Sequence, residues 1–111
     1  MAKGEDNPIK YAVINAANGN NTIVAAVSGH QLRVLGYTII ATSACTVTFQ
    51  DGAGGTAITG VMPLAANGGI SVTPTYIGCF ETATENTLLN IAATGDVDGH
   101  LTYQEFTEIT A

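Results

Sequence analysis

Charge is scarce in this chain, and positive charge is the scarcest. Charged residues make up 11% of the 111 residues, against about 25% in a typical soluble domain. The net charge is −6, and the only cations are Lys3, Lys10 and Arg33. Counterion release on nucleic acid needs several Lys or Arg side chains on one face, and anionic membranes attract the same kind of cluster. We therefore expect no nucleic-acid partner and no membrane partner.

Long apolar runs are also missing. No stretch approaches the roughly 18–20 residues of a transmembrane helix. The start, MAKGEDNPIKY, has no apolar centre of a signal peptide, so we expect synthesis in the cytoplasm. Without an export signal, Cys45 and Cys79 are expected to be two small buried thiols, with a disulfide as the alternative.

The sequence does contain a series of short segments rich in Val, Ile and Thr, separated by Gly, Asn and Asp. No segment has the apolar period of an amphipathic helix. The spacing of the turn residues is typical of a β-sandwich or jelly roll, with a closed barrel as the alternative. We predict strands at 11–15, 22–27, 31–42, 44–51, 56–59, 61–65, 70–74, 77–82, 87–93 and 100–106.

The predicted fold is thus all-β: an antiparallel, jelly-roll-like β-sandwich of about 8–10 short strands. Residues 10–111 form this single domain, and residues 1–9 form a flexible N-terminal arm. The longest predicted strand, 31–42, has apolar residues on both parities, which indicates that both of its faces are covered. Gly36 in its middle predicts a bulge or a close backbone approach.

Motifs for metals and cofactors are incomplete. Residues 95–99 contain D-x-D-G, but the twelfth position of an EF-hand loop counted from Asp96 is Thr107 rather than Glu. We interpret this segment as a β-hairpin turn with Asp-Gly supplying positive φ, with an opportunistic metal site as the alternative. His30 and His100 are expected to be surface or turn-closing residues. We therefore predict no metal site and no cofactor.

Catalytic patterns are missing as well. No serine lies in G-x-S-x-G, and we predict no catalytic residue. If the protein were a small hydrolase, Glu81 and Glu105 would be the candidate carboxylate pair, although a solvated acidic rim is the simpler interpretation. Tyr11, Tyr76 and Tyr103 are the candidate stacking platforms for a sugar.

Seven segments between residues 27 and 105 carry a resemblance to a known family. They are VSG (27–29), RVLGY (33–37), VTFQDG (47–52), GTAITG (55–60), LAANGGI (64–70), FET (80–82) and GHLTYQE (99–105). With these segments the chain resembles small proteins encoded in the structural gene clusters of tailed bacteriophages, similar to capsid decoration or head-fibre proteins. It departs from that pattern in an acidic turn at 95–98 and in a longer tail after Glu105.

The resemblance implies a β-sandwich that works as a trimer on a virion. We therefore expect a non-enzymatic capsid decoration (cement) protein, which binds the outer surface of a phage head and stabilises it. Its partners would be the major capsid protein and copies of itself. The uncharged surface fits this role because it costs little to desolvate. The predicted partner-binding residues are Lys3, Pro8, Ile9, Lys10 and Tyr11 in and after the arm, and Asn67.

A receptor- or glycan-binding module of a head or tail fibre is the alternative function. It predicts exposed Tyr and Asn side chains at one end of the sandwich. The loops 66–69 and 76–78 are the candidates for this site.

Overall fold

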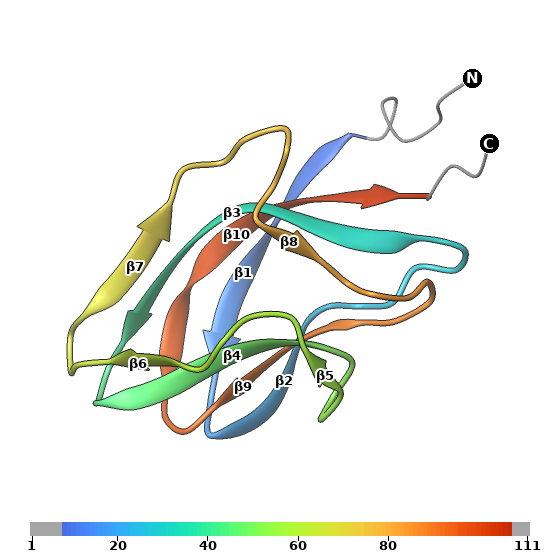
Figure 1. The fold of residues 1–111 in the computed structure, drawn as a ribbon. Helices are drawn as coiled ribbons and strands as arrows, with labels where there is room; N and C mark the ends of the chain where they lie inside the picture. The colour runs from blue at the N-terminus through green and yellow to red at the C-terminus, as the bar shows by residue number, and fades with distance from the viewer. Residues whose placement is uncertain (1–7, 108–111) are drawn as a thin grey trace.

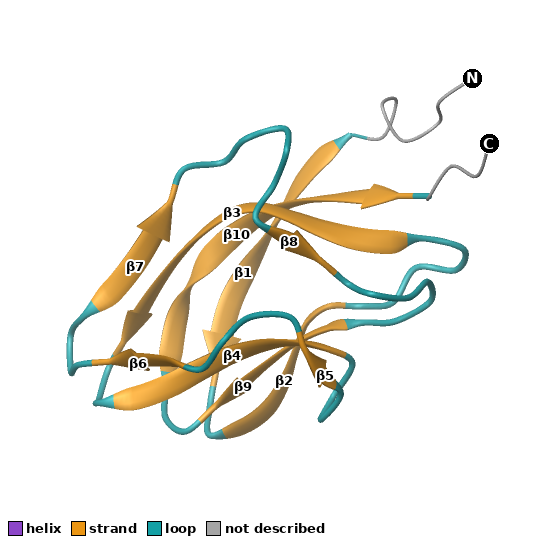
Figure 2. Cartoon of the chain, in the orientation of Figure 1, coloured by secondary structure: helices purple, strands orange, loops and turns teal. Residues whose placement is uncertain are grey.

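The computed structural model describes residues 8–107, and these form ten strands and no helix (Figures 1 and 2). The strands are β1 Ile9–Ala16, β2 Gly19–Val24, β3 Gln31–Ala41, β4 Cys45–Asp51, β5 Thr56–Ala57, β6 Met62–Leu64, β7 Gly69–Val72, β8 Phe80–Glu81, β9 Leu89–Ala93 and β10 Val97–Phe106. Each predicted strand overlaps one of these. The all-β prediction is confirmed.

The ten strands form two five-stranded antiparallel sheets that pack face to face. Sheet A has the order β1-β10-β3-β7, and β8 also pairs with β3. Sheet B has the order β2-β9-β4-β5, and β6 also pairs with β4. The chain crosses repeatedly between the sheets, and the two orders are those of a jelly roll. The predicted sandwich is therefore confirmed, and the barrel alternative is wrong.

The core lies between the inner faces of the two sheets. It contains three aromatic rings in contact, Tyr37 and Phe80 from sheet A and Phe49 from sheet B. Their centroids lie 4.8 to 5.9 Å apart in tilted pairs, the geometry that aromatic quadrupoles favour. Burial raises the pKa of the Tyr37 hydroxyl, with a smaller contribution from nearby Cys79. Through Phe80 the ring cluster connects the short β8 of sheet A to sheet B.

A bulge interrupts β3 where it pairs with β10. The register shifts between Thr102 and Tyr103, so that Leu35 and Gly36 together lie opposite Thr102. Tyr37 and Ile39 therefore point into the core with Val34, whereas Leu35 lies on the other face and Ile40 is 52% exposed. The predicted bulge at Gly36 is confirmed. The extra residue reverses the alternation beyond it, and the prediction that both faces of this strand are covered is wrong at the exposed Ile40.

The structure corrects two further predictions. β1 begins at Ile9 rather than residue 11, and Ile9 and Lys10 pair with Gln104 and Tyr103. Ile9 therefore belongs to the sheet rather than to an arm. The segment after β9 is not a hairpin turn, because β9 lies in sheet B and β10 in sheet A; it links the two sheets.

Candidate binding surface

The predicted partner-binding residues lie in two separate places. Lys3 lies outside the described residues, and Pro8, Ile9, Lys10 and Tyr11 are exposed at the start of β1. The backbone N–H of Asn67 donates to the Ala41 carbonyl at the opposite end of sheet A, where Ala41 pairs with Val97. Because Ile9 pairs with Gln104, seven residues of β10, or roughly 23 Å, separate the two places. The structure does not bring Asn67 to the β1 residues.

The outer face of sheet A carries exposed apolar side chains along β1. Ile9, Tyr11 and Val13 are 49%, 79% and 72% exposed, whereas Ile14 and Ala16 on the other face are buried. This alternation follows from the two-residue period of a strand. β1 thus presents an apolar stripe, Ile9-Tyr11-Val13, to solvent.

The connection between β7 and β8 extends the exposed apolar surface. Within it, Tyr76 is 83% and Ile77 88% exposed. Hydrogen bonds fix the base of this loop: the Thr75 N–H donates to the Leu35 carbonyl at 3.2 Å, and the Cys79 N–H donates to the Val34 carbonyl at 2.7 Å. The loop therefore holds two large apolar side chains in solvent on a fixed base.

Gly36 allows this loop to approach sheet A. A Cβ at Gly36 would lie 2.6 Å from the Pro74 nitrogen and 2.7 Å from both Pro74 Cα and the Val72 carbonyl oxygen. No side chain fits in that space. The predicted close backbone approach at Gly36 is confirmed, and it places Pro74 against β3.

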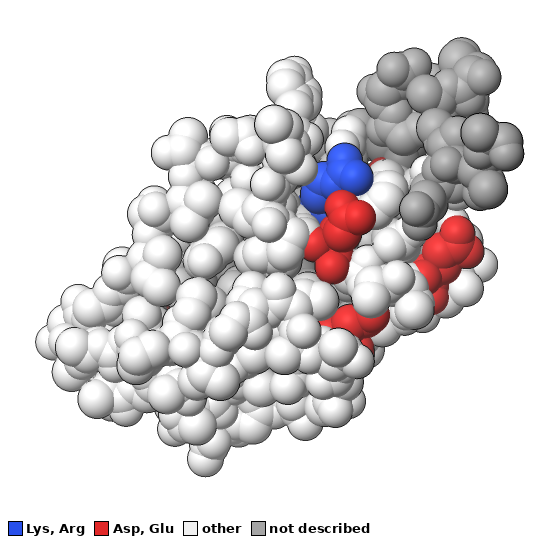
Figure 3. Space-filling model, viewed as in Figure 1, with Lys and Arg blue, Asp and Glu red and all other residues white. Residues whose placement is uncertain are grey.

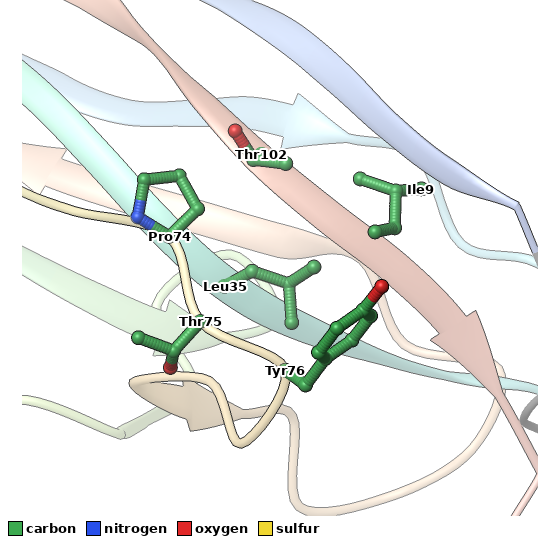
Figure 4. Close-up of a pocket in the computed structure, with 6 residues that line it drawn as sticks. All are labelled: Ile9, Leu35, Pro74, Thr75, Tyr76 and Thr102. Carbon is green, nitrogen blue, oxygen red and sulfur yellow. The ribbon is translucent and has the colours of Figure 1, made fainter.

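An apolar pocket of about 190 Å³ lies between this loop, β1 and β10 (Figure 4). Its lining residues are Ile9, Leu35, Pro74, Thr75, Tyr76 and Thr102. Figure 4 shows these side chains around one hollow, with the Tyr76 ring turned toward Ile9. The bulge creates this pocket, because it turns Leu35 outward beneath the loop.

A polar pocket of about 160 Å³ adjoins the apolar one, and both share Pro74 and Thr102. Thr38, Ser71, Thr73 and His100 also line it. The hydroxyls of Thr38 and Ser71 lie 2.9 Å apart. Two pockets of different chemistry therefore lie side by side on the outer face of sheet A. We call this region, with the Ile9-Tyr11-Val13 stripe, the sheet A surface.

Charge is sparse on the described part of the molecule. Figure 3 shows one face that is mostly uncharged, with its few charged side chains gathered to one side. Among residues 8–107 the two Lys or Arg side chains both form ion pairs: Lys10 Nζ lies 3.1 Å from Glu105 Oε2, and Arg33 Nε lies 3.0 Å from Glu81 Oε1. The Arg33 guanidinium also stacks 4.3 Å from the centroid of the Phe106 ring.

The candidate carboxylate pair is not brought together. In the strand registers, Glu81 of β8 lies opposite Arg33 of β3, and Glu105 of β10 lies opposite Leu32 of β3. Arg33 and Leu32 are neighbours in one strand, so their side chains point to opposite faces. Glu81 and Glu105 therefore lie on opposite faces of sheet A, each beside its own cation, and they form no paired-carboxylate site.

The remaining candidate residues have local roles. His30 closes the turn before β3, with Nδ1 2.9 Å from the Ser28 carbonyl oxygen, and His100 is exposed on β10, as predicted for both. Tyr103 is half-buried against the core, unlike Tyr11 and Tyr76. No group of three or more His, Cys, Asp or Glu side chains within residues 8–107 is arranged to hold a metal ion.

The two cysteines are free thiols with different surroundings. Cys45 is buried, as predicted, whereas Cys79 is exposed, and that prediction was wrong. The Cys79 thiol still lies 3.5 Å from the Leu35 carbonyl oxygen, and partial burial raises its pKa. The disulfide alternative is not formed.

Sequence reasoning missed most of the pocket-lining residues. Leu35, Pro74, Thr75 and Thr102 were not predicted as site residues, whereas Ile9 was predicted as a partner-binding residue and Tyr76 as a stacking platform. The one usable signal in the sequence was Gly36. It predicted a close backbone approach, but not which segment of the chain makes that approach.

Comparisons with known proteins add no assignment, since no family model and no curated protein matches this chain. The described residues include no helix that is long and apolar enough to cross a lipid bilayer.

Proposed function

We propose that this chain is a non-enzymatic structural protein of a phage virion, a capsid decoration protein that binds the outer surface of the head and stabilises it. The observation that carries the proposal is the sheet A surface, where Tyr76 and Ile77 are held in solvent beside an apolar pocket. Contiguous exposed apolar surface marks interaction sites in soluble proteins. The resemblance to phage decoration and head-fibre proteins supports the virion as the place of action.

In this proposal the sandwich acts as a rigid block that lies across neighbouring copies of the major capsid protein. Tyr76 and Ile77 enter apolar depressions on the shell, and aromatic anchors of this kind carry much of the energy of an interface. One copy binds with modest affinity because the contact is small. Several linked copies compensate, since each further contact forms at high effective concentration. The resemblance implies a trimer for this purpose.

Binding to capsids tests the proposal directly. Empty heads assembled from the major capsid protein of the encoding phage would be sedimented with the purified protein. We expect saturable binding, reduced at least tenfold in the double variant Tyr76→Ser, Ile77→Ser. Val61→Ser is the matched control, since Val61 is 65% exposed elsewhere. Absence of binding by the unaltered protein would reject the proposal.

The role of the N-terminal segment is a separate test. Because Ile9 is part of β1, a truncation that leaves the sheet intact removes residues 1–7 only. If this segment reaches across neighbouring capsid subunits, the truncated protein keeps its thermal melting temperature but loses capsid binding. Full occupancy by the truncated protein would mean that the segment makes no contribution.

A glycan-binding module is the second candidate, and one observation favours it. The exposed Tyr76 ring lies beside a pocket lined with the hydroxyls of Thr38, Ser71 and Thr73, and aromatic faces next to hydrogen-bonding groups suit sugar rings. A glycan array would show hits that Tyr76→Ser removes. An array without hits, together with tight capsid binding, would reject this candidate.

A further inference from the structure

The edge strands of the two sheets differ in how they are protected. An edge strand leaves one row of backbone N–H and C=O groups unpaired, and such a row can accept another strand. Proteins block this by keeping edge strands short, by placing Pro or a charge on them, or by a bulge.

Among residues 8–107, every edge strand except β1 is short, contains Pro or shifts its register. β5 has two residues, and β6 has three with Pro63 in the middle. β7 has four residues and is followed closely by Pro74, while β8 has two. β2 is longer, but its pairing with β9 shifts register between Thr22 and Val24. These strands offer short or irregular edges to an approaching strand.

β1 is longer and more regular, and its only such devices are Pro8, which directly precedes it, and Lys10. Its eight residues pair with β10 without a register shift, from Ile9 opposite Gln104 to Ala16 opposite Val97, and within residues 8–107 it pairs with no other strand. It contains neither Pro nor Gly. Its one charge, Lys10, is already paired with Glu105. The outward side chains Ile9, Tyr11 and Val13 belong to the types enriched in strands.

We propose that β1 pairs with β1 of a second copy of this chain, antiparallel and about a two-fold axis, so that two A sheets join into one continuous sheet. Such an axis, perpendicular to the sheet, keeps outward residues outward in both copies. Residues directly opposite must share a face, so odd-numbered residues lie opposite odd-numbered residues. In the register centred on Ala12, Tyr11 of each copy lies opposite Val13 of the other.

The second copy fits β1 for two reasons. The stripe is self-complementary, since aromatic and β-branched residues across strands stabilise each other, and no unpaired charge of β1 would be buried. The surface removed from solvent is small. Because the outward side chains stay on the outer face, edge pairing covers only their flanks and the β1 backbone, which is less than the total of about 1,000 Å² that specific interfaces bury. The dimer is therefore expected to dissociate on dilution in the micromolar range.

Solution mass as a function of concentration tests the pairing. Sedimentation equilibrium of the full chain should show a monomer–dimer equilibrium. Val13→Lys places a charge in the middle of the edge and should weaken dimerisation at least tenfold. Val61→Lys is the matched control, because Val61 is similarly exposed, at 65% against 72%, but lies outside β1. The control should dimerise as the unaltered protein does.

Three outcomes overturn the inference: a monomer at all concentrations, a dimer that Val13→Lys leaves unchanged, or a closed trimer without a dimer. A trimer would leave the decoration proposal intact, because that proposal requires several copies but not this contact. Conversely, a β1 dimer that fails to bind heads would reject the decoration proposal alone.

A second measurement does not depend on the folding of a variant. Hydrogen exchange of the unaltered protein should show β1 amides that become protected as the concentration rises, while the β2 and β7 edges do not change. Exchange in β1 that is independent of concentration would overturn the pairing, whatever the behaviour of Val13→Lys.

Discussion

The outer faces of the two sheets differ in the contacts that their side chains make. On sheet B, Asn90 lies between two other amides, and its Nδ2 donates to Asn20 Oδ1 at 3.1 Å and to Gln50 Oε1 at 2.8 Å. On sheet A, the Ile9-Tyr11-Val13 stripe and the loop residues Tyr76 and Ile77 extend into solvent. The Asn90 amide of sheet B thus makes its donor bonds within the molecule, whereas sheet A leaves large apolar side chains mostly in solvent.

This difference indicates which face is available for binding. Self-contained polar networks make a surface with little to gain from a partner, because its hydrogen bonds are already made. Exposed apolar side chains gain free energy when a partner removes them from water. Both faces belong to one domain of uniform composition, so the distinction depends on side-chain direction rather than on amino-acid content.

The largest expected effect is on the base of the sheet A surface. Gly36→Ala places a methyl group against the Pro74 backbone, which must move, and overpacking of this kind costs about 1–3 kcal/mol. Urea denaturation would measure the loss. Gly60→Ala is the control, because no atom lies within 4 Å of its Cβ position, and it should keep or slightly raise stability. Equal stability of both variants would contradict the close approach.

A smaller effect is expected from the amide network of sheet B. Asn90 is fully buried, and Asn90→Ala removes both hydrogen bonds at a cost of about 1–2 kcal/mol. The net stabilisation by the Asn90 side chain is limited, because its Oδ1 is buried without a hydrogen-bond partner in the described structure. Asn15→Ala, at an exposed position on sheet A, should change stability by less than about 0.5 kcal/mol. Equal losses of stability in Asn90→Ala and Asn15→Ala would contradict the difference between the two outer faces.

The smallest effect concerns pH and the core that both sheets share. Burial raises the pKa of the Tyr37 hydroxyl. The unfolded chain therefore loses the hydroxyl proton at a lower pH than the folded protein does. The stabilisation is complete below the unfolded pKa of about 10 and declines as pH rises through the folded value. Tyr37→Phe should make the urea midpoint less sensitive to pH above about 10. Equal pH sensitivity of the unaltered protein and of Tyr37→Phe would contradict this contribution.

Local patterns in the sequence predicted the strands well. Alternation such as Val47 and Phe49 against Thr46 and Thr48 predicted the inner and outer faces of β4, and all four lie as expected. Turn residues predicted the breaks between strands. The Gly36 bulge was predicted, but the reversal of side-chain directions after it was not.

Pairing between distant segments could not be predicted in the same way. Glu81 and Glu105 both lie on strands, but only the register of β8 and β10 against β3 places them on opposite faces. The link after β9 resembled a hairpin because local sequence does not specify which sheet a strand joins. Cys79 is exposed because it ends the loop over Leu35, and the position of that loop depends on the packing at Gly36.

The pairing of β1 with β10 also has a consequence for how the chain is made. Lys10 and Glu105, which form an ion pair across these strands, are 95 positions apart in the chain. At translation rates of roughly 5–20 residues per second, about 5–20 s pass between the synthesis of the two strands. During that interval β1 has no partner strand. Sheet A therefore forms only after β10 has been synthesised, and β1 remains unpaired until then although it is the first strand of the sheet to be made.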